Sequence, residues 1–317
     1  MSGVHTVVAS HDAGVPPRLT THDSRLTCLA LLTAAILCRP ISASAAETVE
    51  RTVPADPRGK VEIVCVSGDI HVQGWDRNEV QVTGLIGGSA QRLDIRSSAK
   101  HTLIQVETER GRSVSADLKV RVPLDSALSI NTVSADQAVD NLKGTQHLQA
   151  VSGDITTALW SEDIEAKTIS GDVEVRGHSG DALVSVTTVS GEIVLSEAPA
   201  EFELETVSGD MRIATDRLRR GRIRTTNGEV ELKAKLSGDA RLDAEAINGD
   251  LRFELARPVD AQFDVETFNG EIDNCFGPKP VRIREFGPGK ALRFTEGAGE
   301  ARVRVKTLNG AVNICSR

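Results

Sequence analysis

The chain has 317 residues, with 37 Lys and Arg against 45 Asp and Glu, and a formal net charge of −8. Hydrophobic residues make up 39% of it and aromatic residues only 3%, with no tyrosine. Its ordinary charged fraction of 26% excludes a disordered polyelectrolyte. The acidic balance and the scarcity of aromatic side chains exclude the basic, base-stacking surface that nucleic-acid binding requires.

Residues 1–46 have the pattern of a secretory signal peptide. The apolar run Leu26–Leu37 follows Arg18 and Arg25 and precedes the small residues Ser42–Ala46. Positive, apolar and small residues in that order are typical of an export signal, and the run is too short to span a bilayer; a buried helix is the alternative. We expect a cleaved signal peptide with an extended basic region, a mature form with no transmembrane span, and an exported protein in the periplasm or at the cell surface.

Residues 47–126 are expected to form a β-rich N-terminal cap together with the first rungs of a repeat. They contain one clear copy of the motif described below and are otherwise irregular. Alternating apolar and polar residues predict strands at Val61–Ile63, Glu79–Val82 and Leu118–Pro123.

A short motif recurs through the chain and dominates its sequence. Each copy is an apolar residue, Ser or Asn, Gly, Asp or Glu, and a second apolar residue, flanked by alternating apolar and polar residues. From position 135 onward the copies follow every 18 to 21 residues, except for a last step of 40. This period predicts strand, turn and strand in each unit. The turn glycines are Gly68, Gly153, Gly171, Gly191, Gly209, Gly228, Gly249, Gly270 and Gly310.

Two architectures fit such repeats, a meander of antiparallel hairpins and a β-solenoid. The solenoid is favoured because equivalent positions hold matched residues: Thr, Ala or Cys three places before the glycine position, and Ser, later Asn, directly before it. Stacked rungs place like residues ~4.8 Å apart, where small hydroxyls or amides can form ladders. We predict an all-β fold, a single β-helix-like solenoid with rungs of roughly 18–21 residues over residues 127–317, in which each corner rests on its predecessor.

A carboxylate follows the glycine position in most copies of the motif. Turn carboxylates ordinarily accept a backbone N–H and stay in solvent, whereas oxygen-rich rows recruit calcium. The glycine-rich signature of calcium-binding β-rolls is absent. We therefore expect no cofactor, and Ca²⁺ binding is the alternative. The acidic ladder consists of Asp154, Asp172, Glu192, Asp210, Glu229, Asp250 and Glu271.

Cys275 and Cys315 each lie five residues after their turn glycine. In adjacent rungs their Cα atoms would be ~4.8 Å apart, which a disulfide can span, whereas two rungs apart they would be too distant. We predict a Cys275–Cys315 disulfide, with residues 276–298 leaving the stack as a hairpin; two buried thiols are the alternative. Cys65 occupies the Thr/Ala position and is expected to be a small core residue.

The sequence contains no recognisable constellation of catalytic residues. Histidines beyond the signal segment are scattered, and the motifs of nucleophile elbows, P-loops and zinc proteases do not occur. The basic run Arg217–Arg224 favours a solvated rung edge over a contact with an anionic surface. We expect neither catalytic nor metal-binding residues; a carboxylate pair in the acidic column, acting on polysaccharide, is the alternative.

Repeated Thr-Val-Ser-Gly-Asp-Val-x-Val units, with the opening Ser67–Asp76 and Val80–Val82, resemble the bacterial "putative adhesin" family, a β-strand-repeat domain of unknown function. The resemblance covers residues 47–317. It implies an exported or envelope-associated β-solenoid without established catalytic residues. We expect a non-enzymatic, adhesin-like structural or interaction protein of the cell envelope, whose partner is an envelope protein or a surface glycan. A polysaccharide hydrolase or lyase on a β-helix and an envelope-signalling partner are the alternative functions.

Overall fold

The computed structural model describes residues 47–316 except 88–90, 109–114, 178–180 and 285–286. The predicted signal peptide, residues 1–46, lies outside the described residues. No described residue is helical, and this part of the chain therefore has no helix long and apolar enough to cross a membrane. The prediction of an all-β fold is confirmed: the described residues form 23 strands joined in one hydrogen-bonded sheet.

The strands fall into three groups along the chain. The N-terminal group is β1 (Glu47–Pro54), β2 (Lys60–Trp75), β3 (Glu79–Ile86), β4 (Gln91–Ser97), β5 (His101–Thr108) and β6 (Ala116–Pro123). The central group is β7 (Ala127–Asp140), β8 (Gln146–Ser152), β9 (Ile155–Ala158), β10 (Ile164–Ser170), β11 (Val173–Arg176), β12 (Leu183–Ser190), β13 (Ile193–Ser196), β14 (Glu201–Ser208), β15 (Met211–Asn227), β16 (Val230–Asn248) and β17 (Leu251–Leu255). The C-terminal group is β18 (Ala261–Asn269), β19 (Ile272–Asn274), β20 (Val281–Arg282), β21 (Lys290–Glu296), β22 (Ala301–Asn309) and β23 (Val312–Ser316).

Each copy of the motif forms an arch, in which one strand segment enters the Ser/Asn-Gly corner and another leaves it. We name each arch by the residue at its glycine position. Neighbouring arches pair in parallel and in register: Ser152 is opposite Ser170, which is opposite Ser190. A meander would instead oppose consecutive strands in antiparallel fashion, so the pairing between these arches excludes it.

The core lies between the two strand layers of the arches. Because side chains alternate along a strand, every second residue points inward. Ala166, Val186 and Leu204 occupy equivalent places in β10, β12 and β14 and are fully buried. Gly221 takes an inward position beside the ring of Phe202, where an added Cβ would lie 2.9 Å from the ring carbon Cζ. The period-2 pattern of the sequence thus places the apolar residues in one continuous core.

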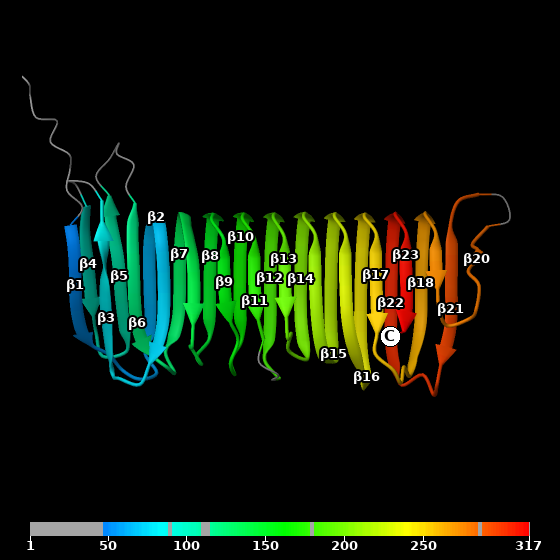
Figure 1. Cartoon of the computed structure of the whole chain (residues 1–317), viewed down its shortest axis with the longest axis horizontal. Helices are drawn as coiled ribbons and strands as arrows, with labels where there is room; N and C mark the ends of the chain where they lie inside the picture. Colours follow the sequence, from blue (N-terminus) through cyan, green and yellow to red (C-terminus); the bar gives the residue numbers. More distant parts are fainter. Residues whose placement is uncertain (1–46, 88–90, 109–114, 178–180, 285–286, 317) are drawn as a thin grey trace, which may run out of the picture. The chain divides into compact units, whose positions relative to one another are not determined.

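At the C-terminal end, the order of the arches departs from the order of the chain. β22 pairs with β16 on one side and with β18 on the other, and β23 likewise lies between β17 and β19. Figure 1 shows β22 and β23 in red between the yellow β17 and the orange β18. The Gly310 arch is therefore inserted between the Gly249 and Gly270 arches. The expectation that each corner rests on its chain predecessor is wrong here, because the 40-residue step is long enough to cap the Gly270 arch and return.

The segment before the inserted arch forms a terminal hairpin. β21 runs antiparallel to β18, and β20 runs antiparallel to β21. Phe263 packs against Phe276 and Phe294, with ring centroids 5.5 and 4.5 Å away. This aromatic cluster anchors the hairpin on the last arch.

A disulfide joins Cys275 to Cys315, with their Cα atoms 4.8 Å apart. It links the Gly270 arch to the inserted Gly310 arch, which are adjacent in the stack. Cys65 is a buried free cysteine, and its burial raises the pKa of the thiol. Burial and a raised pKa both make this thiol unreactive.

The N-terminal strands also change the direction of pairing. β5 and β6 lie beside β2 in parallel, opposite the side on which β2 pairs with β7. β4 then pairs antiparallel with β5, β3 antiparallel with β6, and β1 antiparallel with β3. Antiparallel strands thus cover both strand layers at the N-terminal end and cover β18 at the C-terminal end, which hinders further parallel addition.

Removing the disulfide with the Cys275→Ala/Cys315→Ala double variant is expected to lower the free energy of unfolding by about 2–4 kcal/mol, because the bond constrains a 40-residue segment in the unfolded chain. Urea unfolding measures this, and reduced wild-type protein should unfold with the variant. Cys65→Ala is the control, because it leaves the disulfide in place, and the intact mass of this variant checks that the disulfide is present. Equal stability of variant and wild type would contradict the expectation.

Candidate functional site

The corners of the arches determine which residues the stack presents on one edge. Gly171 and Gly191 have φ values of +151° and +144°. An added Cβ on Gly171 would lie 2.2 Å from the carbonyl oxygen of Gly153, and one on Gly191 would lie 2.0 Å from that of Gly171. Only glycine fits, because the backbones of neighbouring corners touch. The predicted turn glycines lie at these contacts.

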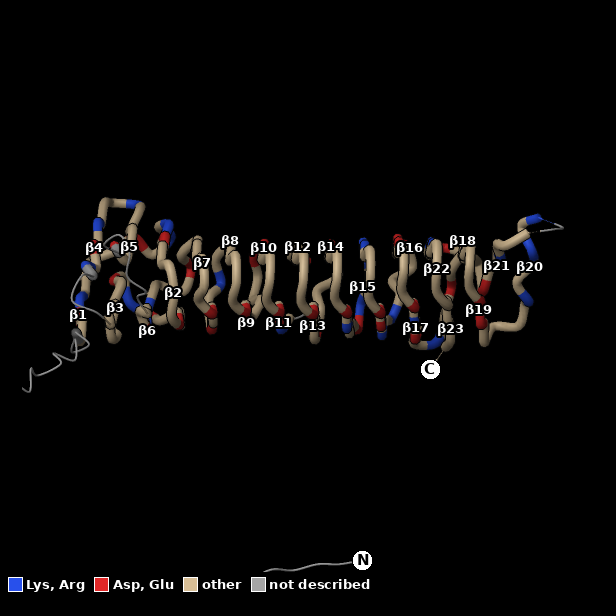
Figure 2. Tube along the Cα trace, turned by 90° about the horizontal axis from the view of Figure 1, so that it is seen from above, with Lys and Arg blue, Asp and Glu red and all other residues tan. Residues whose placement is uncertain are grey.

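The aspartates of the acidic column bind the backbone of the neighbouring arch. Asp154 accepts a hydrogen bond of 2.8 Å from the amide of Asp172, and Asp172 accepts one of 2.7 Å from the amide of Glu192. Asp210 and Asp250 do the same for the amides of Glu229 and Ala311, both at 2.8 Å. Figure 2 shows these acidic segments recurring beside β9, β11 and β13. The turn carboxylate here accepts the hydrogen bond of a backbone amide that would otherwise lack an acceptor.

The glutamates of the same column have a different role. Glu229 forms an ion pair of 2.6 Å with Arg252, which lies on the strand leaving the next corner. Glu192 pairs in the same way with Arg212, and Glu271 pairs with Lys290 of the terminal hairpin. The extra methylene of glutamate moves its carboxylate past the corner amide and toward these cations. The acidic column therefore consists of two kinds of contact between arches.

Asparagines in the corner form a side-chain ladder, whereas threonines do not. The Asn248 amide donates to Asn227 at 2.9 Å, and the Asn309 amide donates to Asn248 at 2.7 Å. An amide group spans the distance between arches because its donor and acceptor lie on opposite sides. A single hydroxyl cannot span ~4.8 Å. Four buried threonine hydroxyls in the column three places before the glycine have no hydrogen-bond partner: Thr168, Thr188, Thr206 and Thr225.

An exposed row of apolar side chains runs along the same edge, and we call it the apolar ridge. It consists of the residue two places before each glycine position. Because the residue before it in the chain is buried, alternation turns this one toward solvent. Exposed fractions range from 44% to 53%. In stack order the ridge is Val66, Val133, Val151, Ile169, Val189, Val207, Ile247, Leu308 and Phe268, interrupted by Thr226.

These apolar residues belong to the motif, and the motif alone does not separate them from the core. The signal was present, since Thr206 and Val207 are consecutive and only one of them can face inward. Most exposed apolar side chains of a folded protein are scattered singly, whereas contiguous exposed rows are typical of interaction surfaces.

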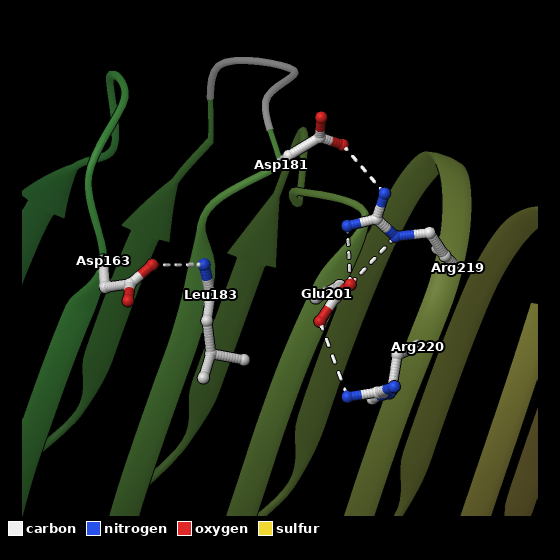
Figure 3. Close-up of polar contacts among 6 residues, drawn as sticks. All are labelled: Asp163, Asp181, Leu183, Glu201, Arg219 and Arg220. Atoms are coloured by element: carbon white, nitrogen blue, oxygen red, sulfur yellow. Dashed lines mark hydrogen bonds and ion pairs between the residues drawn. The ribbon is translucent and has the colours of Figure 1, made fainter.

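Charged side chains cover the outward face of the strands that enter the corners. Arg219 lies between Glu201 and Asp181, at 2.6 and 3.3 Å, and the Glu201 carboxylate raises the pKa of Arg219 (Figure 3). Arg220 also reaches Glu201, at 3.9 Å. This part of the basic run therefore lies beside carboxylates of neighbouring segments, which reduces its attraction for an anionic surface.

Histidines and carboxylates form scattered contacts on the surface. His101 contacts Glu62 and His147 contacts Glu165, both at 3.1 Å. A hydrogen bond from Lys167 lowers the pKa of Glu165, with His147 adding to the effect. Among the residues that the structure describes, no group of three or more His, Cys, Asp or Glu side chains is arranged to hold a metal ion.

Comparison with known sequences places the chain in a family. The sequence model of the Toastrack DUF4097 family matches residues 19–202 and 148–315. This chain belongs to the Toastrack DUF4097 family. The resemblance to the "putative adhesin" β-strand-repeat family is thereby confirmed. No curated protein matches the chain.

Three of the solved structures that the chain matches come from bacteria. A putative adhesin of Bacteroides fragilis is 9% identical, with a TM-score of 0.46, and the match covers 85% of this chain and 98% of that one. A putative adhesin of Parabacteroides distasonis is 11% identical, with a TM-score of 0.38 and coverage of 86% and 98%. A putative cell adhesion protein of Clostridium sporogenes is 9% identical, with a TM-score of 0.24 and coverage of 86% and 100%. Similarity this remote carries no function over to this chain.

Thr188→Val is expected to raise the free energy of unfolding by up to about 1 kcal/mol, because it removes a buried hydroxyl that has no partner. Thr215→Val is the matched control: it makes the same change where the hydroxyl donates to the carbonyl of Ala198 at 2.9 Å. This control should lower stability by about 1–2 kcal/mol. Urea unfolding of both variants measures these two changes. If the free energy of unfolding changed in the same direction in both, the distinction between a hydroxyl with a hydrogen-bond partner and one without would be wrong.

Asp172→Ala is expected to lower the free energy of unfolding by roughly 0.5–1.5 kcal/mol, since the amide of Glu192 loses its acceptor. Asp273→Ala removes the same charge from an exposed strand position and should have a smaller effect. Calcium added to chelator-treated wild type is expected to leave the melting temperature unchanged. A calcium-dependent rise that Asp172→Ala abolishes would show that the column binds the ion instead.

Proposed function

We propose that this chain is an exported, non-enzymatic interaction protein of the cell envelope, and that its apolar ridge binds an adhesion partner. The ridge is the observation that supports this function most directly. Its side chains are roughly half exposed at equivalent places in successive arches. An apolar row of this kind gains stability when a partner removes it from water.

The proposal includes a single β-solenoid as the scaffold. Parallel, in-register pairing over repeats of 18–21 residues supports it, as does membership of the Toastrack family. In this interpretation residues 47–126 are the cap with the first rungs, residues 127–317 are the repeat, and residues 276–298 are a hairpin excursion. A solenoid presents an extended face on which each rung adds one contact, and such faces bind elongated partners.

Export is supported by two features of the chain. The sequence begins with the pattern of a signal peptide, and the structure contains a disulfide, which is typical of oxidising compartments. We therefore place the protein in the periplasm or on the cell surface, with an envelope protein or a surface glycan as its partner.

The exported full-length protein should cosediment with envelope fractions of its own cells, and a ridge variant should not. Val151→Ser/Ile169→Ser/Val189→Ser removes three ridge side chains without disturbing buried residues. We expect a loss of at least about tenfold in affinity, since each buried aliphatic side chain contributes roughly 1.5–3 kcal/mol when fully covered.

The matched control changes the next outward residue in the same arches, as Gln149→Ser/Lys167→Ser/Thr187→Ser. It should bind as wild type does, and all variants should melt normally. Equal binding by ridge and control variants would count against the ridge as the binding surface. Release of reducing ends from envelope polysaccharide by wild-type protein would count against a non-enzymatic role.

A further inference from the structure

A groove of about 460 Å³ crosses the apolar ridge in the C-terminal half of the stack. Thr226 interrupts the ridge here, between Val207 and Ile247, and the groove is lined by residues of four neighbouring arches. In stack order these are the arches of Gly209, Gly228, Gly249 and Gly310. The groove exists in this form only because the Gly310 arch is inserted next to the Gly249 arch.

Two columns of charged residues run beside the ridge on the same outward face. In both columns the sign of the charge alternates from arch to arch through the four arches. The column next to the ridge is Glu205, Arg224, Glu245 and Lys306, all exposed. The second column is Glu203, Arg222, Asp243 and Arg304, exposed except for the half-buried Glu203.

When the order acid, base, acid, base is laid against the same order read backwards, each acid is opposite a base. A two-fold axis can pass through the middle of the groove, perpendicular to the long direction of the stack and parallel to the strands. Rotation about this axis would place a second copy face to face with the first, with the order of its arches reversed. Glu205 then faces Lys306 of the second copy, and Arg224 faces Glu245. The second column obeys the same rule, so every acid of these two columns in the four arches meets a base.

The same symmetry operation also pairs the ridges. Val207 meets Leu308 of the second copy, and Ile247 covers the position of Thr226 over the groove. Apolar contacts therefore lie in one strip, bordered by a strip of opposite charges, which is the usual arrangement of an interface core and rim.

Registers shifted by one arch are unfavourable. A shift in one direction places Arg224 against Arg224 of the second copy, and a shift in the other direction places Glu245 against Glu245. Most facing charges are then alike. A shift by two arches toward the Gly270 end keeps opposite charges facing, because Glu266 continues the first column, but only four arches then overlap. The register centred on the groove is favoured because it combines opposite charges with the larger overlap.

We propose that a second copy of this chain docks antiparallel on this face and forms a two-fold symmetric dimer. The proposal rests on the proposed function, because it names the partner for the C-terminal part of the same ridge. Six arches overlap, from Gly191 to Gly270, and give ~600 Å² per copy or ~1,200 Å² in total, at the lower end of specific interfaces. The N-terminal part of each ridge, including Val151 and Ile169, remains free for an envelope partner.

One pair of charges separates this dimer from contacts within a chain. Arg224 and Glu245 already form an ion pair of 3.8 Å between neighbouring arches of one chain. Glu205 and Lys306 lie three arches apart, ~14 Å, and can therefore meet only between copies. Within its own chain Lys306 pairs instead with Glu266 of the adjacent arch, at 3.8 Å. Substitutions at these two positions test the interface directly.

Sedimentation velocity of the full chain should show a concentration-dependent dimer. Glu205→Lys and Lys306→Glu should each weaken dimerisation at least about tenfold, because each places two like-charge contacts in the dimer. An equimolar mixture of the two variants should dimerise again, since Lys at 205 of one then faces Glu at 306 of the other. The Glu205→Lys/Lys306→Glu double variant should also recover dimerisation.

Lys167→Glu is the matched control, because it reverses a charge in the same column outside the overlap, and it should dimerise as wild type does. A wild-type chain that stays monomeric up to ~100 μM would overturn the proposal. So would single variants that dimerise normally, or a mixture that does not recover. Envelope cosedimentation of the monomeric variants keeps the two proposals apart, because the free N-terminal ridge should still bind.

Discussion

Parallel, in-register hydrogen bonding between neighbouring arches is the interaction on which the other features of this structure depend. The amide of Gly171 donates to the carbonyl of Ser190 at 3.0 Å, and the amide of Gly191 donates to that of Ser208 at 3.1 Å. Since this pairing aligns equivalent residues, each side chain has its own counterpart as a neighbour. Glycine is then required where backbones touch. Asparagine is favoured where side-chain amides can hydrogen-bond from arch to arch, and aspartate is favoured where a backbone amide would otherwise lack an acceptor.

Much of the fold can be predicted from the sequence because the repeat is visible in the residue type at individual positions. The turn glycines, the alternation of apolar residues and the all-β class are local properties, and local pattern suffices to predict them. The order of the arches is not local. A 40-residue step between Gly270 and Gly310 fits both a missing rung and an inserted one, and only the pairing of β22 with both β16 and β18 distinguishes them.

The candidate site was hidden for a different reason. Val207 and Met211 are both apolar positions of the motif, but Val207 is exposed and Met211 is buried. The corner between them changes which side of the strand faces inward, and composition alone does not show this change. Alternation from the buried Thr206 does show it. The pattern of charges in the two outward columns also has meaning only when the Gly310 arch is placed beside the Gly249 arch.

The inserted final arch has a consequence for how the chain reaches its native state. Synthesis delivers the N-terminus first, so the Gly249 and Gly270 segments are present before β22 and β23 are made. Until then both segments have an unpaired strand edge facing the slot, the position between them that the Gly310 arch later fills. Unpaired edges of this kind can pair with incorrect strands. A chain cut short before β22 has nothing to fill the slot and no Cys315 to close it. Formation of the native stack thus depends on β22 and β23, which fill the slot after the arches on both sides of it have been made.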